Sequence, residues 1–547
     1  MKTKLLIVLL FVTTNFFAQQ EEAWVYFNAK PNAASFFSAP LSELTQRSLD
    51  RRTTQGIALD SKDAPIHQPY VDQIEAATGI TVLAKSKWLN MVHVRGLQTD
   101  IAALTGFSFV DHIQYANHSL NPGGRIVQNL NKTSKVNKWQ DTNSTQINYN
   151  YGSSATQVQM LNCHILHQNN YTGNGKVVAI LDAGFPGVNT AAPFESLRSR
   201  GLILGGYDFV NNSTSFYTGN SHGTNVLSTM GANATNLIGT APDAGYYLFI
   251  TEDIATETPI ELSNWVEAAE EADRLGVDVI NSSLGYFAFP DYPSASYTYA
   301  HMNGQTSVAS RAVDIAFDKG MICVISAGNE GNNAEPHVGT PADALRAITV
   351  GSVTSTEVKS GFSSIGPTGD GRMKPDLMAM GSSSVISNTG GTITTANGTS
   401  FSSPILAGAI TSFWSAFPNK TNAEIVQYVK ASADRYAASI LVPNNNYGYG
   451  IPDFQLAMNS ALSTPEFETN KIVKVYPNPI NTEITISITE EWRGSSFELY
   501  NQLGQKIVKT MIYSSLQKLK VNDVASGVYY YSISNGNQTL QGKLIKN

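Results

Sequence analysis

Short apolar runs alternate with helical patterns through the middle of the chain. Two amphipathic patterns of helical period run from Ser263 to Leu275 and from Ser310 to Asp318. Around them lie four β-branched runs with the length of buried strands, at 176–181, 277–281, 321–326 and 347–350. Strands that are apolar on both faces and alternate with helices are typical of a mainly parallel sheet flanked by helices. The pattern therefore predicts one α/β domain over residues 155–462.

The pattern changes on both sides of this domain. Residues 19–120 change element about every ten residues, which predicts a small α+β domain. Residues 473–547 contain short strand-like runs separated by Asn, Gly and Ser, which predicts a small antiparallel β-sandwich. Segments 121–154 and 463–472 are polar with little periodicity, and we expect them to be linkers.

The first residues have the pattern of a secretory signal peptide. Lys2 and Lys4 precede an apolar run over 5–12, and Ala18 stands at a suitable cleavage point. This run is too short to span a bilayer. We therefore expect residues 1–18 to be removed and the mature protein to be exported. No other apolar run reaches the length of a membrane helix, so we expect no membrane-spanning segment.

Composition and cysteine content narrow the function further. The chain has 36 Lys+Arg, 43 Asp+Glu and a net charge of −7, so nothing predicts a nucleic-acid partner. Two cysteines in 547 residues do not make a disulfide scaffold. Cys323 lies in a predicted buried strand and Cys163 on a helical pattern. We expect both to be buried free thiols rather than a bridge or a catalytic cysteine.

Three polar residues of the α/β domain have the chemistry of acyl transfer. Asp182 follows the first apolar run, at the strand end where open α/β sheets usually carry their sites. His222 precedes a helical pattern, and Ser400 stands near the start of an apolar run that predicts a buried helix. Acyl transfer needs a nucleophile, a base of near-neutral pKa and a carboxylate that orients the base. Asp182, His222 and Ser400 are therefore our candidate catalytic residues.

A fourth candidate is Asn329, which follows the strand-like run 321–326. Its side-chain amide could bind an oxyanion together with the backbone N–H of Ser400. Each candidate alone has an ordinary explanation, because Asp182 could cap a turn, most histidines are surface or core groups, and Asn329 suits a left-handed turn. The hypothesis depends on their joint occurrence.

Four segments together resemble the signature blocks of the subtilisin-like serine proteases, the S8 or subtilase family. They are Asp182-Ala183-Gly184, His222-Gly223-Thr224, Ser326-Ala327-Gly328-Asn329-Glu330-Gly331 and Gly398-Thr399-Ser400-Phe401-Ser402-Ser403-Pro404. The order Asp, His, Ser, with gaps of 40 and 178 residues, fits this family and not the α/β-hydrolases, whose order is Ser, Asp, His. The resemblance covers about 177–452. Ala183 departs from it, since the family usually has Ser or Thr there.

The resemblance also implies a substrate cleft. The segment 281–285 resembles the strand that lines the cleft, and 339–341 resembles the floor of the specificity pocket with its cis-proline turn. The substrate-binding residues implied are Ser283, Leu284, Gly285, Gly328 and Gly339. Because no acid or base is placed at the floor, we expect large apolar side chains to be accepted there. Family members often bind calcium, but no ligand set can be aligned here, so we expect no cofactor and leave the ligands of a structural calcium ion unassigned.

Both flanking regions gain roles from the resemblance. Residues 19–120 stand where such proteases carry an inhibitory, fold-assisting propeptide. The C-terminal region, with Tyr476-Pro477-Asn478-Pro479, resembles the sorting domain read by the type IX secretion system of Gram-negative bacteria, although a carbohydrate-binding or adhesive sandwich is the alternative. The expected partners are protein or peptide substrates and the outer-membrane secretion machinery. The expected location is secreted or cell-surface.

The resemblance implies a serine endopeptidase made as a zymogen. A catalytically weak or inactive surface binding protein with the same fold is the alternative. This alternative stays open because Ala183 stands where the family usually has Ser or Thr. An esterase or lipase would share the chemistry, and hydrolysis of proteins would distinguish it.

Overall fold

The structure is a computed structural model that describes residues 20–121, 148–433, 442–462, 473–536 and 539–547. The expected signal peptide, most of the first linker and the second linker lie outside these ranges. The chain divides into two units, Met1–Met458 and Asn459–Asn547.

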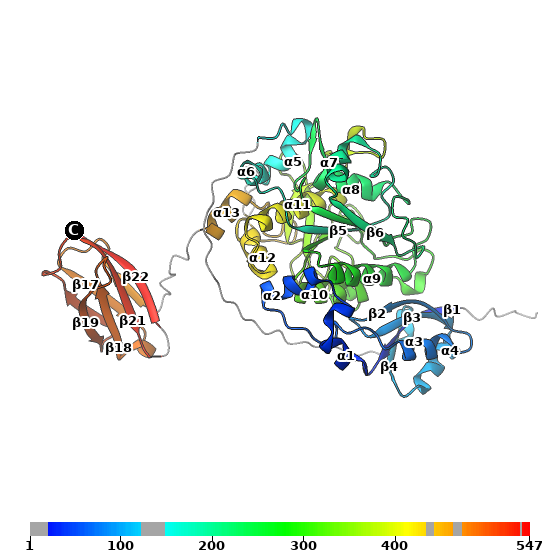
Figure 1. Ribbon diagram of the computed structural model, residues 1–547, viewed down its shortest axis with the longest axis horizontal. Coiled ribbons are helices and arrows are strands. Elements are labelled where there is room, and N and C mark those ends of the chain that lie inside the picture. The colour runs from blue at the N-terminus through cyan, green and yellow to red at the C-terminus, as the bar shows by residue number, and fades with distance from the viewer. Residues whose placement is uncertain (1–19, 122–147, 434–441, 463–472, 537–538) are drawn as a thin grey trace, which may run out of the picture. The chain divides into compact units, whose positions relative to one another are not determined.

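A seven-stranded sheet with the order β13-β12-β11-β10-β5-β9-β6 forms the centre of the first unit (Figure 1). Its strands are β5 (Val177–Asp182), β6 (Ile203–Asp208), β9 (Gly245–Ile250), β10 (Val279–Ser282), β11 (Ile322–Ser326), β12 (Ile348–Val353) and β13 (Leu377–Met380). Every neighbouring pair is parallel. The predicted parallel sheet is therefore confirmed. Because all strands point the same way, the residues that follow β9, β5, β10 and β11 meet along one edge.

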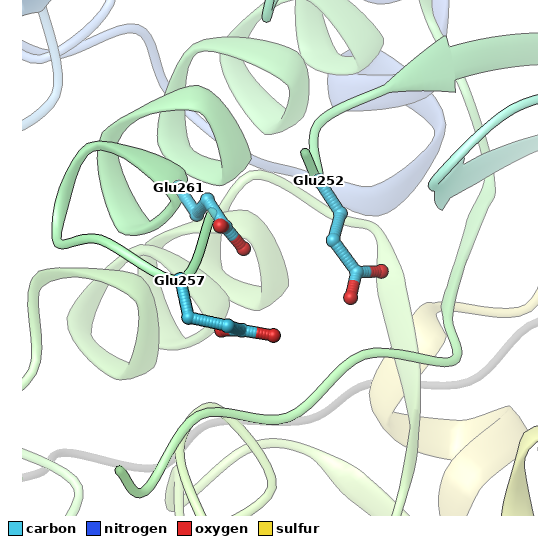
Figure 2. Close-up of side chains that lie close together, drawn as sticks. All are labelled: Glu252, Glu257 and Glu261. Carbon is cyan, nitrogen blue, oxygen red and sulfur yellow. The ribbon is translucent and has the colours of Figure 1, made fainter. Parts of the chain in front are cut away.

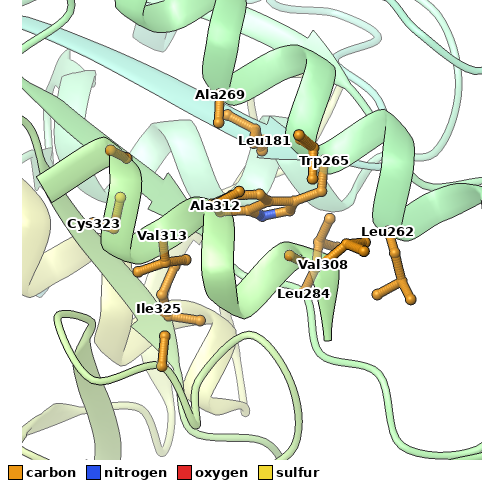
Figure 3. Packing of buried hydrophobic residues seen from close by; sticks show 14 of the residues in the cluster. Leu181, Leu262, Trp265, Ala269, Leu284, Val308, Ala312, Val313, Cys323 and Ile325 are labelled. Carbon is orange, nitrogen blue, oxygen red and sulfur yellow. The ribbon is translucent and has the colours of Figure 1, made fainter. Parts of the chain in front are cut away.

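Helices cover both faces of this sheet. On one side α9 (Ile260–Leu275) and α10 (Val308–Asp318) pack against β5, β10 and β11 around the fully buried Trp265 (Figure 3). The Trp265 indole N–H donates to the Ser282 hydroxyl at 3.0 Å, which fixes the end of β10. On the other side lie α8 (His222–Gly231) and the almost wholly buried α11 (Thr399–Ala416), which contacts β10 to β13.

Shorter elements complete the α/β domain. They are α5 (Ala155–Gln159), α6 (Cys163–Gln168), α7 (Glu195–Ser199), α12 (Asn422–Ala431), α13 (Phe454–Leu462), β7 (Asn233–Ala234), β8 (Leu237–Ile238), β14 (Ser384–Ser387) and β15 (Ile393–Ala396). Cys163 and Cys323 are free and buried, as predicted. None of the described helices is long and apolar enough to cross a membrane.

The N-terminal region is an α+β layer, as the sequence predicted. Its antiparallel sheet has the order β2-β3-β1-β4. The elements are β1 (Gln20–Phe27), β2 (Thr81–Ser86), β3 (Met91–Leu97), β4 (Val110–Tyr115), α1 (Ala33–Ser38), α2 (Gln46–Gln55), α3 (Gln68–Glu75) and α4 (Gln98–Ala103). Alternate residues of β1 serve two cores, because Val25 packs within this layer while Trp24 packs against the α/β domain.

Polar contacts tie this layer to α9. The Trp24 indole N–H donates to the Ser263 hydroxyl at 2.9 Å. The Arg52 guanidinium, itself buried, bonds Asp273 of α9 at 2.8 Å, and the neighbouring Arg51 pairs with the same carboxylate. The N-terminal layer therefore covers the face of the α/β domain that α9 and α10 form.

The second unit is a two-sheet sandwich with its own apolar core. One sheet has the order β16-β17-β20 and the other β19-β18-β21-β22, and all pairs are antiparallel. The strands are β16 (Val473–Tyr476), β17 (Glu483–Ile488), β18 (Ser495–Tyr500), β19 (Lys506–Ile512), β20 (Leu516–Lys520), β21 (Gly527–Ser534) and β22 (Thr539–Lys546). The predicted antiparallel fold of this region is confirmed.

Candidate active site

Asp182 and His222 form a hydrogen-bonded pair at the edge of the central sheet. Asp182 ends β5 with its side chain fully buried, and His222 is the first residue of α8 rather than preceding that helix. The His222 Nδ1 and Asp182 Oδ1 atoms are 2.7 Å apart, and the Ala183 backbone N–H donates to the same oxygen at 2.8 Å. The second oxygen, Oδ2, is buried with no partner among the described residues. Among these contacts, His222 is the one side chain that bonds Asp182. Asp182 therefore orients the His222 ring.

The surroundings of His222 favour its protonated form. Burial disfavours the imidazolium ion, but the negative charge of Asp182 and its hydrogen bond outweigh that effect, with Glu252 adding to it, and raise the pKa of His222 to about 9. An imidazole accepts a proton only when it is neutral. The fraction of His222 that is neutral and can act as a base therefore increases as the pH rises through about 9.

Ser400 is the second residue of α11, where the helix N-terminus presents free backbone N–H groups. Its hydroxyl donates to the Ser283 carbonyl at 3.3 Å, and the Ser283 hydroxyl donates back to the Ser400 carbonyl at 3.0 Å. Within the described ranges, no hydrogen bond joins Ser400 to His222. The His222 ring lies 6.0 Å from the ring of Phe401, the next residue, so the imidazole is beside the serine. Catalytic hydrogen bonds often tighten only when substrate binds.

Asn329 is exposed, and its amide oxygen is already occupied. The backbone N–H and the hydroxyl of Thr399 both donate to Asn329 Oδ1, at 2.9 and 3.1 Å. The Asn329 Nδ2 group therefore remains as the donor that faces away from Thr399. Gly328 precedes it with φ of +103°, a conformation that residues with a Cβ rarely adopt. Thr399 also bonds the Gly328 backbone, so this threonine holds the whole turn.

The substrate-binding candidates also come together. Ser283, Leu284 and Gly285 follow β10, and the next residue, Tyr286, pairs with Thr340 through backbone hydrogen bonds of 2.7 and 3.1 Å. This pairing brings Gly339 beside the segment, since a Cβ on Gly339 would lie only 2.9 Å from the Tyr286 carbonyl oxygen. The Thr340–Pro341 bond is cis, as the resemblance implied.

Leu284 differs from the other candidates of this segment. The residue is 5% exposed, and its side chain packs in the core beside Trp265 (Figure 3). The side chain is therefore not available to a substrate.

Three glutamates that the sequence analysis did not single out lie close to this site. Carboxylate oxygens of Glu252, Glu257 and Glu261 lie within 4.8 Å of one another (Figure 2). Burial, then the charges of Asp182 and Glu257, raise the pKa of Glu252 to about 7. Burial, then Glu257 and Glu252, raise the pKa of Glu261 to about 10. Glu257 and Glu261 are four residues apart, a helical spacing, but Glu252 lies five residues before Glu257, so no single helical or strand period groups all three.

Comparison with known proteins defines the class of this protein. The description "Peptidase S8 propeptide domain, Bacteroidota" matches residues 22–138, "Subtilase family" matches 173–450, and "Secretion system C-terminal sorting domain" matches 474–547. These matches define a serine peptidase with a propeptide and a secretion sorting domain. The sorting domain indicates a secreted or cell-surface protein.

Sequence identity to two subtilisins agrees with this class. The chain is 31% identical over 305 residues to Subtilisin NAT of Bacillus subtilis subsp. natto, which covers 55% of this chain and 70% of that protein. It is equally 31% identical to the subtilisin of Bacillus pumilus, over 55% of this chain and 97% of that protein. The crystal structure of MycP1 from Mycobacterium smegmatis matches with a TM-score of 0.44 and 20% identity, over 57% of this chain and 86% of that one. The chain belongs to the subtilase family.

Proposed function

We propose that this protein is an exported serine endopeptidase, made as a zymogen, that hydrolyses peptide bonds in proteins through an acyl-enzyme on Ser400. The observation that carries the proposal is the 2.7 Å contact between His222 and Asp182 beside the N-terminus of α11. Membership of the subtilase family supports it. The comparisons with known proteins do not favour the alternative of an inactive binding protein.

Each step of the reaction has a group to perform it. His222 takes the proton of Ser400 through Nε2, because Nδ1 is held by Asp182. The Ser400 oxygen attacks the peptide carbonyl, and the Asn329 Nδ2 group and the Ser400 backbone N–H bind the oxyanion. Asp182 stabilises the imidazolium ion, which then protonates the leaving amine. Water hydrolyses the acyl-enzyme by the same route in reverse, and the chemistry requires no cofactor.

The cleft suggests how a substrate is held. The backbone of Ser283 to Gly285 is placed to pair with an extended peptide, with Gly328 and Gly339 leaving space for the side chain before the scissile bond. We expect this side chain to be large and apolar. Cleavage of a peptide library should therefore show apolar residues at that position, and a strict requirement for Arg, Lys, Asp or Glu there would refute this part of the proposal.

The experiment that tests the proposal compares the chain from Gln19 onward with its Ser400→Ala variant. Casein hydrolysis and intact mass are measured for both. We expect casein cleavage and loss of the N-terminal region in the parent and neither in the variant.

A matched control uses another serine of the same helix. Ser415 is partly buried and bonds only within α11, so Ser415→Ala should behave as the parent. If the parent stays inactive after its N-terminal region has been removed by a trace of added protease, the binding-protein alternative replaces the proposal.

A further inference from the structure

A proline stands one turn after the candidate nucleophile in α11. In an α-helix, the carbonyl of each residue accepts a hydrogen bond from the backbone N–H four residues later. For Ser400 that residue is Pro404, which has no N–H and whose ring crowds the carbonyl four residues before it. The Ser400 carbonyl therefore lacks its α-helical donor and needs one from outside the helix.

The hydroxyl of Ser283 is that outside donor. Ser283 follows β10 and is 6% exposed, and its hydroxyl donates to the Ser400 carbonyl at 3.0 Å. The Ser283 carbonyl in turn accepts the Ser400 hydroxyl at 3.3 Å. Both the side chain and the backbone of the nucleophile are therefore bonded to the first residue of the candidate substrate segment, residues 283–285.

A buried asparagine sets the direction of the Ser283 hydroxyl. Asn281 lies in β10 and is fully buried. Its Nδ2 group donates to the Ser283 hydroxyl oxygen at 3.2 Å, and its Oδ1 atom accepts the Ser403 hydroxyl at 2.9 Å. Because a hydroxyl has a single proton and Asn281 is already the donor in their shared bond, the proton of Ser283 is free for the Ser400 carbonyl.

These bonds form a closed path between the sheet and the helix. Ser403 lies in the same turn of α11 as Ser400, so Asn281 and Ser283 contact that turn at two points, three residues apart. The peptide unit held in this way belongs to the residue whose hydroxyl attacks and whose N–H binds the oxyanion in the proposed mechanism. A shift of that unit would move both groups relative to a bound substrate.

We propose that Ser283 and Asn281 are positioning residues for the nucleophile. The Ser283 hydroxyl, directed by Asn281, replaces the N–H that Pro404 does not have and fixes Ser400 relative to the substrate segment. The inference rests on the proposed peptidase function. A misplacement on the order of 1 Å at a reacting group costs up to about 100-fold in rate, so the loss of this contact acts on kcat rather than on substrate affinity.

The test restores the missing donor by a second substitution. Ser283→Ala should lower kcat by about 10- to 100-fold and leave KM within about twofold. Pro404→Ala gives α11 the N–H that the Ser400 carbonyl lacks. The double variant should therefore have a kcat within about threefold of that of Pro404→Ala alone. Steady-state kinetics on a peptide with an apolar residue before the scissile bond measure both effects.

Two further variants separate positioning from folding. Asn281→Ala should lower kcat, and adding it to Ser283→Ala should lower kcat by less than about threefold more, because both residues act through one hydrogen bond. Ser412→Ala removes another buried hydroxyl of α11, which donates to the Thr240 carbonyl at 2.7 Å, and should keep the kcat of the parent.

The same pair of substitutions has a readout that needs no activity. In the full chain with Ser400→Ala, Ser283→Ala should lower the unfolding temperature. It should lower it less when residue 404 is already alanine, because the helix N–H then satisfies the carbonyl. An inactive parent would refute the proposed function, and this measurement would still decide whether the Ser283 hydroxyl replaces the N–H that Pro404 lacks.

Four results would overturn the proposal. Ser283→Ala could keep the kcat of the parent, or it could raise KM with kcat unchanged, which would place the hydroxyl on the substrate instead. Pro404→Ala could fail to restore kcat in the double variant. The fall in unfolding temperature on Ser283→Ala could be equal with proline and with alanine at position 404.

Discussion

At the scale of single residues, the proposed mechanism depends on side chains that a neighbouring group holds in one orientation. Asp182 orients His222, and Thr399 occupies the amide oxygen of Asn329 so that the amide nitrogen is left as a donor. Both contacts fix a side chain that would otherwise have several rotamers. The geometry therefore predicts that kcat falls both when the Asn329 donor is removed and when Thr399, which positions that donor, is changed.

Asn329→Ala is expected to lower kcat by about 100-fold or more with little change in KM, because an oxyanion donor acts mainly in the transition state. Steady-state kinetics on a peptide substrate measure this. Thr399→Val should lower kcat as well, while Thr399→Ser retains the hydroxyl and should restore most of it. A fall of less than about fivefold for Asn329→Ala would rule out Asn329 as a donor.

The pH dependence follows from the raised pKa of His222. Since the imidazole must be neutral to accept the serine proton, kcat/KM should increase with pH and level off only in the alkaline range, as His222 with a pKa of about 9 loses its proton. A pH profile of kcat/KM from 5 to 10 checks this. A profile that is already flat above pH 6 would show that Asp182 and Glu252 do not raise this pKa.

At the scale of elements, α9 connects the N-terminal layer, the core and the acidic cluster. Trp265 on this helix packs against β5 and β10, while Asp273 on the same helix binds two buried arginines of α2. Burial raises the pKa of Asp273, but the charges of Arg51 and Arg52 outweigh this and lower it. The helix is thus where docking of the N-terminal layer acts on the catalytic domain.

Asp273→Ala should lower the free energy of unfolding of the Ser400→Ala protein by about 3–5 kcal/mol, because it leaves the buried Arg51 without a carboxylate and the buried Arg52 with that of Asp63 alone. Denaturant unfolding measures the change. Asp72→Ala, which removes an exposed carboxylate on α3, is the matched control and should change stability by less than about 0.5 kcal/mol. Equal effects of the two variants would mean that the α2–α9 contact does not stabilise the zymogen.

The elements differ in how far their sequence predicts them. The buried strands β5, β10, β11 and β12 are continuous apolar runs and were predictable. β13 consists of Leu, Met and Ala, which favour helix, so its strand results from its neighbours in the sheet. β6 is a half-exposed edge strand with two adjacent glycines. β9 is rich in aromatic residues, which favour strands, so its sequence does carry a strand signal, although it is not a β-branched run like the others.

The candidate site shows the same contrast. Asp182, His222, Asn329 and Ser400 each lie in a short motif, and the joint occurrence of the four motifs in this order was enough to select them. The role of Thr399 depends on a partner 70 residues away, and the acidic cluster depends on a loop that folds Glu252 back toward Glu261. Contacts of this kind are set by the tertiary fold and leave no local pattern.

At the scale of the whole molecule, the two units have separate apolar cores. The second unit buries its own apolar residues, among them Ile484, Phe497 and Leu544. It matches a secretion sorting domain and contains none of the candidate catalytic residues. We therefore expect catalysis and export to be separable.

Ending the chain at Leu462 should leave the unfolding temperature of the first unit and its casein hydrolysis unchanged while stopping export in a host that has a type IX system. Activity assays on the purified protein and immunoblots of medium and cell fractions measure the two effects. Normal appearance of the shortened protein in the medium would contradict the role of the second unit in sorting.

The most direct test of the central claim is the site of covalent labelling by a serine-reactive sulfonyl fluoride. The mature protein is treated with phenylmethylsulfonyl fluoride, digested and mapped by mass spectrometry, alongside His222→Ala. The account predicts one adduct, on Ser400, in the parent and its loss in the variant, because the base must activate the hydroxyl. An adduct on another serine, or labelling of Ser400 that does not depend on His222, would contradict it.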